Sequence, residues 1–334
     1  MAASTEDLLA RCVVSWCAGA TGIANAARLS GGASQETWSF DIVHPDGNIG
    51  AILRRAPPGY GAAPDRAAGL GAEAMLMQRA YAAGIPSPRV MHVLSPADEL
   101  GTGFIMGRVD GETIPRKILR DEQFAGARPK LARQLGGVLA KIHALSPPQL
   151  PELRRMTAAG EIAELERDYH NLNWPRPVFD LALRWLRDND PGPSSEVTLV
   201  HGDFRHGNLI IGPDGTRAVL DWELAHFGDP MEDLGWICVN SWRFGEIDKP
   251  VGGLGSREEL FAGYEAEGRK VDAARVHFWE VMGTLRWGIM CCGMMQRFRS
   301  GPDHSMERAM IGRRSSETEI DLLRLLAPRH SRRA

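Results

Sequence analysis

Apolar and polar residues alternate along the first third of the chain, in short runs separated by glycine and proline. Leu29 to Phe40 predicts two strands around a glycine-containing turn, and Asp46-Gly47 predicts a hairpin turn into a third, antiparallel strand. The other elements predicted in this part are a helix that begins at Ser4 or Thr5, a helix within 67–83, and strands at 90–93 and 103–106. We therefore expect a small antiparallel sheet with few helices.

Helical spacing of apolar residues dominates after Asp110. The clearest case is a long amphipathic helix over 129–145, which Pro147-Pro148 should end. Further helices are predicted at 160–169, 178–187, 257–267, 273–298 and 306–326. The pattern predicts an α+β fold with two lobes: a nucleotide-binding lobe with its preceding helix over 1–107, and a helical lobe with one embedded hairpin over 108–334.

Length and composition agree with this organisation. A chain of 334 residues is long enough for two domains or one large bilobal unit. Its 43% hydrophobic and 24% charged residues exclude wholesale disorder, collagen-like repeats and a coiled-coil rod. The formal net charge of -3 provides no electrostatic reason to expect nucleic acid or an anionic membrane as a partner. The oligomeric state stays open.

The sequence also argues against a membrane span and a disulfide framework. The most apolar stretch, 278–295, is interrupted by Glu280 and Arg286. Near the N-terminus, Glu6 and Asp7 stand where a signal peptide would carry positive charge. The five cysteines include no CxxC pair, so we expect a reducing, cytoplasmic setting.

The chemistry is concentrated in one strand-rich segment, 198–224. Two apolar runs flank the turn composition Gly212-Pro213-Asp214-Gly215 and should pair as a hairpin. Asn208 precedes the first strand and Asp221 follows the second, so antiparallel pairing brings them to the same end of the hairpin. Asp203, five residues before Asn208, can reach that end too.

Two carboxylates and an amide around one point suit a hard divalent cation such as Mg²⁺. One carboxylate would remain to orient or deprotonate a hydroxyl, which is the arrangement used in phosphoryl transfer. The structural alternative is that each residue caps a turn, as Asp and Asn often do. All three residues occur together at the matching spacing, which favours a metal and base site over turn capping.

The segment resembles a known family. His201-x-Asp203-x4-Asn208, followed by Asp221, is similar to the catalytic loop and metal-binding aspartate of kinase-like enzymes. His-Gly-Asp with Leu-Asp-Trp-Glu and Gly-Asp-Pro-x-x-Asp-Leu resembles the aminoglycoside phosphotransferase family, in the branch associated with acyl-CoA dehydrogenases. The resemblance covers roughly residues 20 to 300 and is strongest over 199–236. It implies a bilobal protein-kinase-like fold and ATP, or GTP, as phosphate donor.

The resemblance implies a role for each residue of the motif. Asp203 would be the catalytic base, and Asn208 and Asp221 would be metal ligands. We expect His201 to support the loop through hydrogen bonds. Arg205 and His206 occupy variable positions, and we interpret them as facing solvent or substrate.

For the nucleotide-binding lobe, the resemblance implies a lysine on the third strand, where this chain has Arg54. Arg54 could pair with phosphates through its fork of donors. Arg55 must point to the opposite face of the strand. Glu73 matches the helix glutamate that pairs with the basic strand residue in kinases, and the alternative is a solvated helix face.

Three further nucleotide contacts are implied by the same resemblance. The first hairpin turn, 30–37, would cover the phosphates, with Ser34 among the contacting residues. The stretch 104–108 would link the lobes, with backbone groups of Met106 and Arg108 near adenine. Outside the nucleotide site, Asp229 and Asp233 are expected at a helix start.

The helical lobe also contains residues that bear on the acceptor. Trp236, Trp242, Trp279 and Trp287 are interpreted as core, with a substrate cleft as the alternative. Arg286 on an otherwise apolar helix needs a partner, either an internal carboxylate or an acidic substrate.

We therefore expect a phosphotransferase with an alcohol group on a small molecule as acceptor. A hydroxy acid or hydroxyacyl thioester is favoured over an aminoglycoside, because no acidic run is available for a polycation. One alternative is a catalytically silent kinase-like binding module. A less favoured one is a metal-dependent hydrolase using His201, Asp203, His206 and Asp221.

Overall fold

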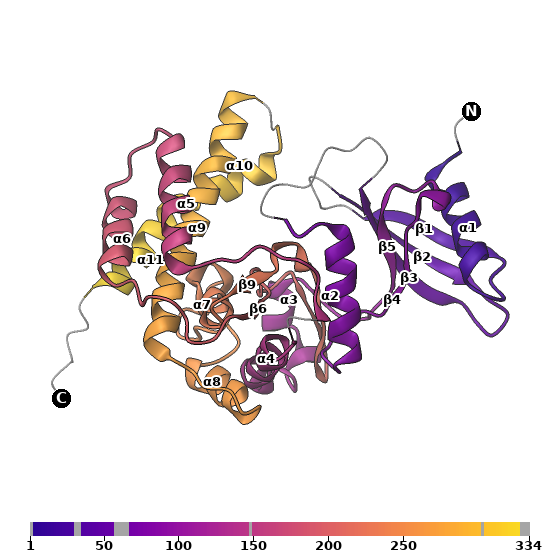
Figure 1. Cartoon of the computed structure of the whole chain (residues 1–334), viewed down its shortest axis with the longest axis horizontal. Coiled ribbons are helices and arrows are strands. Elements are labelled where there is room, and N and C mark those ends of the chain that lie inside the picture. The colour runs from indigo at the N-terminus through magenta and orange to yellow at the C-terminus, as the bar shows by residue number, and fades with distance from the viewer. Residues whose placement is uncertain (1–2, 30–34, 57–66, 147–148, 302–303, 328–334) are drawn as a thin grey trace.

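The computed structural model describes residues 3–29, 35–56, 67–146, 149–301 and 304–327. A lobe built on a twisted sheet lies at one end of the molecule, and a larger helical lobe lies at the other (Figure 1). The fold is bilobal and α+β, as expected. Where the chain passes from one lobe to the other, the last strand ends at Gly107 and the next helix begins at Pro115. A boundary at 107/108 stays a prediction.

The N-terminal lobe is a five-stranded antiparallel sheet in the order β1-β2-β3-β5-β4. Its elements are α1 Thr5–Trp16, β1 Gly22–Leu29, β2 Glu36–Val43, β3 Ile49–Ala56, α2 Leu70–Ala82, β4 Val90–Val93, a 3-10 turn Pro96–Asp98, and β5 Thr102–Gly107. Helix α1 starts at Ser4, whose side chain accepts from the Asp7 N–H while Asp7 accepts from Ser4 in return. Leu9 and Val13 of α1 share a buried core with Phe40 and Leu53 of the sheet.

The C-terminal lobe holds most helices and two small antiparallel sheets, β6 with β9 and β7 with β8. Its elements are α3 Pro115–Arg120, α4 Arg128–His143, α5 Ala158–Asn171, α6 Pro177–Asp188, β6 Thr198–Val200, β7 Leu209–Gly212, β8 Gly215–Val219, a 3-10 turn Trp222–Leu224, β9 His226–Gly228, α7 Met231–Cys238, a 3-10 turn Asn240–Trp242, α8 Arg257–Ala266, α9 Ala273–Ser300, α10 Met306–Gly312 and α11 Ser315–Leu326. No described helix has the length and hydropathy needed to cross a membrane.

Helices α4 and α8 pack unusually closely because each contributes a glycine at the contact. A Cβ on Gly136 would overlap the carbonyl oxygen of Leu260, and one on Gly263 would overlap that of Arg133. Backbone therefore meets backbone, and no larger residue fits at either position. This pair supports the loop that follows β6, because α4 also contacts β6 and β8.

Most predicted elements are confirmed. The first strand is predicted from Leu29 onward, whereas β1 spans Gly22–Leu29, and residues 30–34 of the predicted turn lie outside the described residues. The helix predicted over 306–326 is wrong, because the chain forms α10 and α11 with a break after Gly312. A Cβ on Gly312 would lie 2.9 Å from the backbone nitrogen of Met295, so α10 approaches α9 at this glycine before the chain turns into α11. Both helices pack on α9 as a result.

Candidate active site

The loop after β6 carries the His-Gly-Asp motif and is held by a buried carboxylate from α7. Asp233 accepts hydrogen bonds from the backbone N–H groups of His201 (2.8 Å) and Gly202 (2.9 Å), and it also contacts the ring of His143 at 3.0 Å. Burial alone would raise the pKa of Asp233, but the His143 hydrogen bond and neighbouring histidines lower it. Asp233 lies in the first turn of α7, as expected, and its carboxylate also holds the loop after β6.

His201 links this loop to the strand that leads to Asp221. The N–H of Asp203 donates to His201 Nδ1 (3.2 Å), so Nε2 carries the proton and donates to the carbonyl of Leu220 at 3.1 Å. Burial lowers the pKa of His201, which fits this neutral ring. The expected supporting role of His201 agrees with these contacts.

Both oxygens of the Asp203 side chain are engaged. Oδ1 accepts from Arg205 Nε and from the indole N–H of Trp236, each at 2.9 Å. Oδ2 accepts from the amide of Asn208 at 2.7 Å, and the same amide donates to the Asp203 carbonyl at 2.9 Å. The carboxylate is therefore held in one orientation at the end of a short loop.

Asn208 and Asp221 lie at the same end of the β7–β8 hairpin, as the strand pairing predicted. Leu209 pairs with Val219, and the N–H of Leu220 donates to the carbonyl of Asn208 at 2.8 Å. Asp221 follows immediately with a left-handed backbone (φ 64°, ψ 65°), a conformation that aspartate tolerates better than most residues. This turn directs the chain away from the hairpin into the 3-10 turn at 222–224.

Arg54 brings a cation from the sheet lobe to Asp221. Its Nη2 lies 2.6 Å from Asp221 Oδ1 and 3.6 Å from Glu223 Oε2, while its Nε lies 3.2 Å from Glu73 Oε2. Glu73 on α2 is buried, so the solvated-face alternative is wrong. Burial raises the pKa of Glu73 from its ordinary 4.5 to about 7, despite the opposing influence of Arg54.

Arg55 points to the other face of β3, as strand alternation requires. It is buried and pairs with Glu36 (2.8 Å), with further hydrogen bonds to the Thr5 hydroxyl and the Leu100 carbonyl. Two adjacent arginines therefore have different tasks. Arg54 faces Asp221 and Glu223, and Arg55 joins α1 to β3 and pairs with Glu36 of the neighbouring strand β2.

The remaining nucleotide-site predictions involve the first turn and the end of β5. Ser34 lies outside the described residues. Met106 is buried in β5, paired with Ile52 of β3. Arg108 donates its N–H to the Gly50 carbonyl at 2.9 Å and its side chain to Asp41 at 2.8 Å. The assignment of these residues to the nucleotide stays a prediction.

One residue of the loop, His206, differs from expectation, whereas the partly exposed Arg205 agrees with it. His206 is buried rather than solvent or substrate facing: its Nε2 lies 2.6 Å from the Gly252 carbonyl, and burial lowers its pKa to about 4. Arg205 is half-buried, with its guanidinium on Asp203 and 4.9 Å above the ring of Trp242. The first of these contacts joins residues 46 positions apart, a pairing that local sequence does not indicate.

The tryptophans and Arg286 form the support behind Asp203. Trp236, Trp242, Trp279 and Trp287 are all buried, so the core interpretation holds, but Trp236 also reaches Asp203. Arg286 lies 4.0 Å from the Trp236 ring and donates to Glu232 (3.1 Å) and to the Gly202 carbonyl (3.1 Å). Its partner is thus an internal carboxylate, one of the two expected possibilities. Sequence patterns missed Trp236 as a site residue because nothing local distinguishes it from core.

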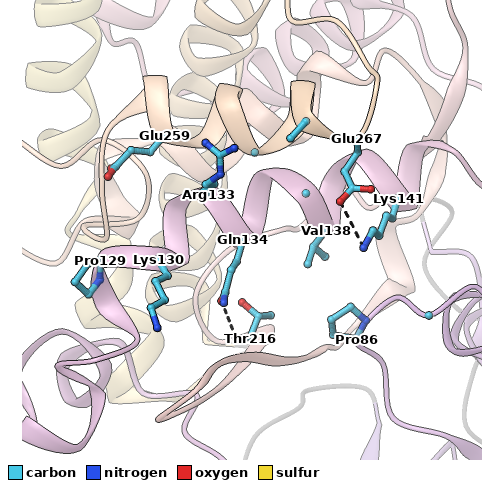
Figure 2. Close-up of a pocket in the computed structure, with 14 residues that line it drawn as sticks. Pro86, Pro129, Lys130, Arg133, Gln134, Val138, Lys141, Thr216, Glu259 and Glu267 are labelled. Atoms are coloured by element: carbon cyan, nitrogen blue, oxygen red, sulfur yellow. Dashed lines mark hydrogen bonds and ion pairs between the residues drawn. The ribbon is translucent and has the colours of Figure 1, made fainter.

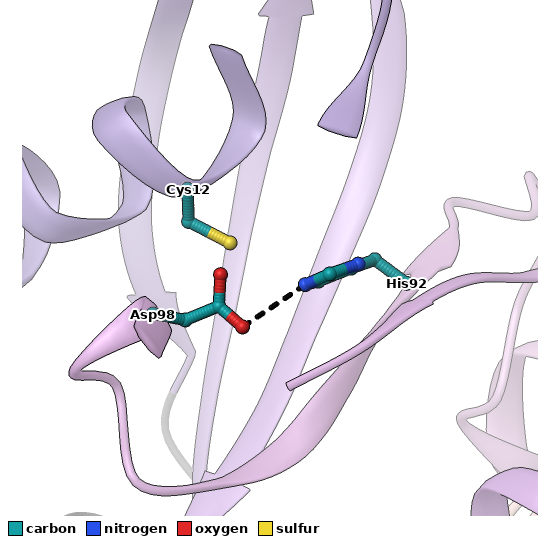
Figure 3. A group of neighbouring side chains, drawn as sticks. All are labelled: Cys12, His92 and Asp98. Carbon is teal, nitrogen blue, oxygen red and sulfur yellow. Dashed lines mark hydrogen bonds and ion pairs between the residues drawn. The ribbon is translucent and has the colours of Figure 1, made fainter. Parts of the chain in front are cut away.

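One other cluster of metal-ligating side chains occurs among the described residues: Cys12, His92 and Asp98, in the sheet lobe (Figure 3). Asp98 Oδ2 accepts from the N–H and the hydroxyl of Ser95 and contacts His92 at 3.1 Å. Burial, then the hydrogen bond with Asp98, raises the pKa of Cys12 to about 12. These contacts cap the 3-10 turn and join it to α1, which is a structural role.

A cavity of about 640 Å³ lies between α4, α8 and the β7–β8 hairpin (Figure 2). The N–H of Thr216 donates to Gln134 across it, and Lys141 pairs with Glu267 at its rim. None of the residues assigned to catalysis or nucleotide lines this cavity. The Asp203 cluster thus lies outside this cavity and stays the candidate site.

Comparison with known proteins identifies the family. Residues 25–270 match the family described as the phosphotransferase enzyme family. The chain belongs to this family. The match spans both lobes, including Arg54, the catalytic loop and Asp221, so the fold and the general capacity for phosphoryl transfer follow from it.

Several relatives and solved structures are similar to this chain. Acyl-CoA dehydrogenase family member 11 of Rattus norvegicus is 31% identical over 58% of this chain, and that of Gallus gallus is 28% identical over 97%. The matches cover only 25% and 42% of those proteins.

A protein of Ralstonia eutropha described as an aminoglycoside phosphotransferase has a TM-score of 0.73 at 20% identity, covering 95% of this chain and 97% of that one. The aminoglycoside phosphotransferase APH(4)-Ia, in a ternary complex with AMP-PNP and hygromycin B, has a TM-score of 0.61 at 20% identity, covering 98% and 99%.

Proposed function

We propose that this phosphotransferase moves the γ-phosphate of ATP, or of GTP, to a hydroxyl group on a small molecule, with Asp203 as catalytic base. One observation carries the proposal: two pairs of residues, Asp203 with Asn208 and Asp221 with Arg54, meet at one end of the β7–β8 hairpin. Phosphoryl transfer needs a group that orients the nucleophile beside groups that neutralise phosphate charge, and these pairs supply both. A structural neighbour that binds AMP-PNP supports ATP as donor.

The side chains at the hairpin end fit a magnesium ion. The amide nitrogen of Asn208 donates to Asp203, which leaves its carbonyl oxygen as the ligand atom, and Asp221 contributes a carboxylate. Oxygen ligands of this kind, few in number and completed by phosphate and water, are what Mg²⁺ prefers. When bound, the ion would neutralise charge on the transferring phosphate.

The residues of this chain have separate roles in the proposed reaction. Asp203, oriented by Trp236 and Asn208, accepts the proton of the acceptor hydroxyl as the oxygen attacks phosphorus. Arg54 pairs with phosphate oxygens through its fork of donors, and Glu73 holds the guanidinium from behind.

The two alternatives have less support. A silent binding module would not need both aspartates and Asn208, and Arg54 keeps the positive charge that the usual lysine would provide. For a hydrolase, His201 and His206 would have to join Asp203 and Asp221 around a metal. Within the described residues both ring nitrogens of His201 are engaged, with the Asp203 N–H and the Leu220 carbonyl, and His206 Nε2 is engaged with the Gly252 carbonyl. These four residues form no metal-ligating group among the described residues.

For the acceptor, we favour a hydroxy acid or a hydroxyacyl thioester. Relatives named after acyl-CoA dehydrogenases support acyl chemistry. The partly exposed Arg205 beside Asp203 supports it as well, because its guanidinium favours an anionic acceptor over a polycationic aminoglycoside.

The test is ATP turnover with magnesium against a panel of hydroxy acids, their coenzyme A thioesters and aminoglycosides. We expect phosphorylation of an acid or thioester and none of an aminoglycoside. Turnover of aminoglycosides alone would refute the acceptor assignment. Absence of turnover across the panel, with intact nucleotide binding, would favour the silent module.

A further inference from the structure

Arg205 makes an ion pair with the very carboxylate that must receive the acceptor hydroxyl. Its Nε lies 2.9 Å from Asp203 Oδ1, and its Nη1 donates to the carbonyl of His206 at 2.9 Å. The guanidinium lies 4.9 Å from the ring centre of Trp242, a cation–π contact. Arg205 therefore has a defined position although 28% of its side chain is exposed.

A hydroxyl that donates to Asp203 competes with the groups already there. Oδ1 holds Arg205 and Trp236, and Oδ2 holds Asn208. Trp236 and Asn208 are buried, whereas Arg205 reaches solvent, so it is the partner that can leave at least cost. Leaving still requires compensation, because separating a partly buried ion pair exposes both charges to poor solvation.

Two other arginines of the helical lobe pair with carboxylates of their own. Arg243 pairs with the buried Glu280 at 2.9 Å, and Arg286 pairs with the buried Glu232 at 3.1 Å. The carboxylate partner of Arg205, by contrast, is the proposed base itself. An anionic acceptor can therefore recruit Arg205 without separating Arg243 from Glu280 or Arg286 from Glu232.

We infer that Arg205 is a specificity residue that couples recognition of an oxyanion on the acceptor to release of Asp203. The inference rests on the proposed function. The oxyanion is either the carboxylate of a hydroxy acid or a phosphate of a thioester carrier. When it pairs with the guanidinium, the charge of Arg205 stays balanced and Oδ1 becomes available to the acceptor hydroxyl. A cationic acceptor offers no such exchange and meets the guanidinium with like charge.

The experiment compares Arg205→Gln and Arg205→Lys with the wild type. Arg217→Gln is the matched control, since Arg217 pairs with Asp214 in the same segment but at the far turn of the hairpin. Acceptors are a short hydroxy acid, its coenzyme A thioester and the neutral diol of equal length. The measurements are KM and kcat for each acceptor, and calorimetric binding of each in the presence of ADP and magnesium. Thermal unfolding monitors the fold of each variant.

We expect Arg205→Gln to raise KM and Kd for the anionic acceptor by about 10- to 100-fold, the scale of one charged hydrogen bond, with the diol and ATP little changed. Arg205→Lys should recover part of the loss, and Arg217→Gln should match wild type. An effect on the acid alone identifies its carboxylate; an effect on the thioester alone identifies the carrier phosphates.

Equal changes for the anionic and neutral acceptors, or a change in ATP affinity alone, would overturn the inference. So would a failure of the wild type to bind any anionic acceptor. Binding that depends on Arg205 without turnover would support recognition of the oxyanion by Arg205 and remove the proposed function. If Arg205→Gln leaves turnover of the acid unchanged, the inference is overturned and the proposed function stands.

Discussion

The two aspartates of the site are held in different ways. The side-chain partners of Asp203 all come from the helical lobe: Arg205, Asn208 and Trp236. Asp221 is paired with Arg54, a residue of the sheet lobe. Asp203 is therefore oriented by its own loop and by α7 of one lobe, while the side-chain ion pair of Asp221 depends on how the two lobes meet. Acceptor chemistry and nucleotide chemistry should consequently respond to different mutations.

The largest expected effect is on the acceptor side. Asp203→Asn should lower kcat by about 10²- to 10⁴-fold, the usual contribution of a general base, because the amide cannot take the hydroxyl proton. Nucleotide affinity should change little, since Asp203 makes no contact with Arg54 or Asp221 among the hydrogen bonds of the described residues. Steady-state kinetics and calorimetric nucleotide titration measure the two separately. Near-normal turnover would remove the base assignment.

On the nucleotide side, Asp221→Ala should weaken magnesium-dependent ATP binding by about 100-fold, since it removes a carboxylate and leaves Arg54 with one fewer partner. Asp221→Asn is the companion variant, because it keeps an oxygen ligand and tolerates the left-handed backbone. It should bind ATP with intermediate affinity. Unchanged affinity of the alanine variant, titrated with magnesium, would show that Asp221 is not a ligand.

Arg54 and Arg55 provide an internal control across one strand. Arg54→Ala should weaken ATP binding by about 10- to 100-fold, and Arg54→Lys should restore part of it if charge matters more than geometry. Arg55→Ala should leave ATP affinity nearly unchanged but lower the free energy of unfolding by about 1–3 kcal/mol, because Glu36 loses its main partner. Equal ATP affinity of the three variants and wild type would show that β3 does not touch the phosphates.

The smallest expected effect is a pH dependence carried by Glu73. Burial raises its pKa to about 7, above the ordinary 4.5, so the folded state binds this proton more tightly than the unfolded state. Stability should therefore fall as pH rises from about 4.5 to about 7 through this group. In Glu73→Gln that contribution is absent. Urea unfolding of both proteins at about pH 5 and about pH 8 should show a steeper loss in wild type; parallel changes would contradict the raised pKa.

Sequence patterns predicted the elements well where a local signal existed. The spacing of Leu131, Leu135 and Leu139 indicated α4, and the turn at 212–215 indicated the hairpin that brings Asn208 to Asp221. Strand alternation separated Arg54 from Arg55. Each of these inferences depends on residues only a few positions apart, for which backbone periodicity is a sufficient guide.

Long-range contacts were not available from such patterns. Asp233 holds the amides of His201 and Gly202 from about thirty positions away, and His206 reaches Gly252. The break between α10 and α11 likewise depends on where Gly312 meets α9. In all three cases the deciding partner is chosen by tertiary packing, which overrides the local preference of the residue.

The left-handed backbone at Asp221 restricts which residues can replace this aspartate during evolution. Alanine and most larger residues are strained in this conformation, by about 1 kcal/mol or more, whereas asparagine and glycine are not. A descendant of this chain that lost phosphoryl transfer but kept its fold is therefore expected to carry asparagine or glycine at position 221. Among diverged homologues, inactive members should be recognisable by that narrow choice of replacement.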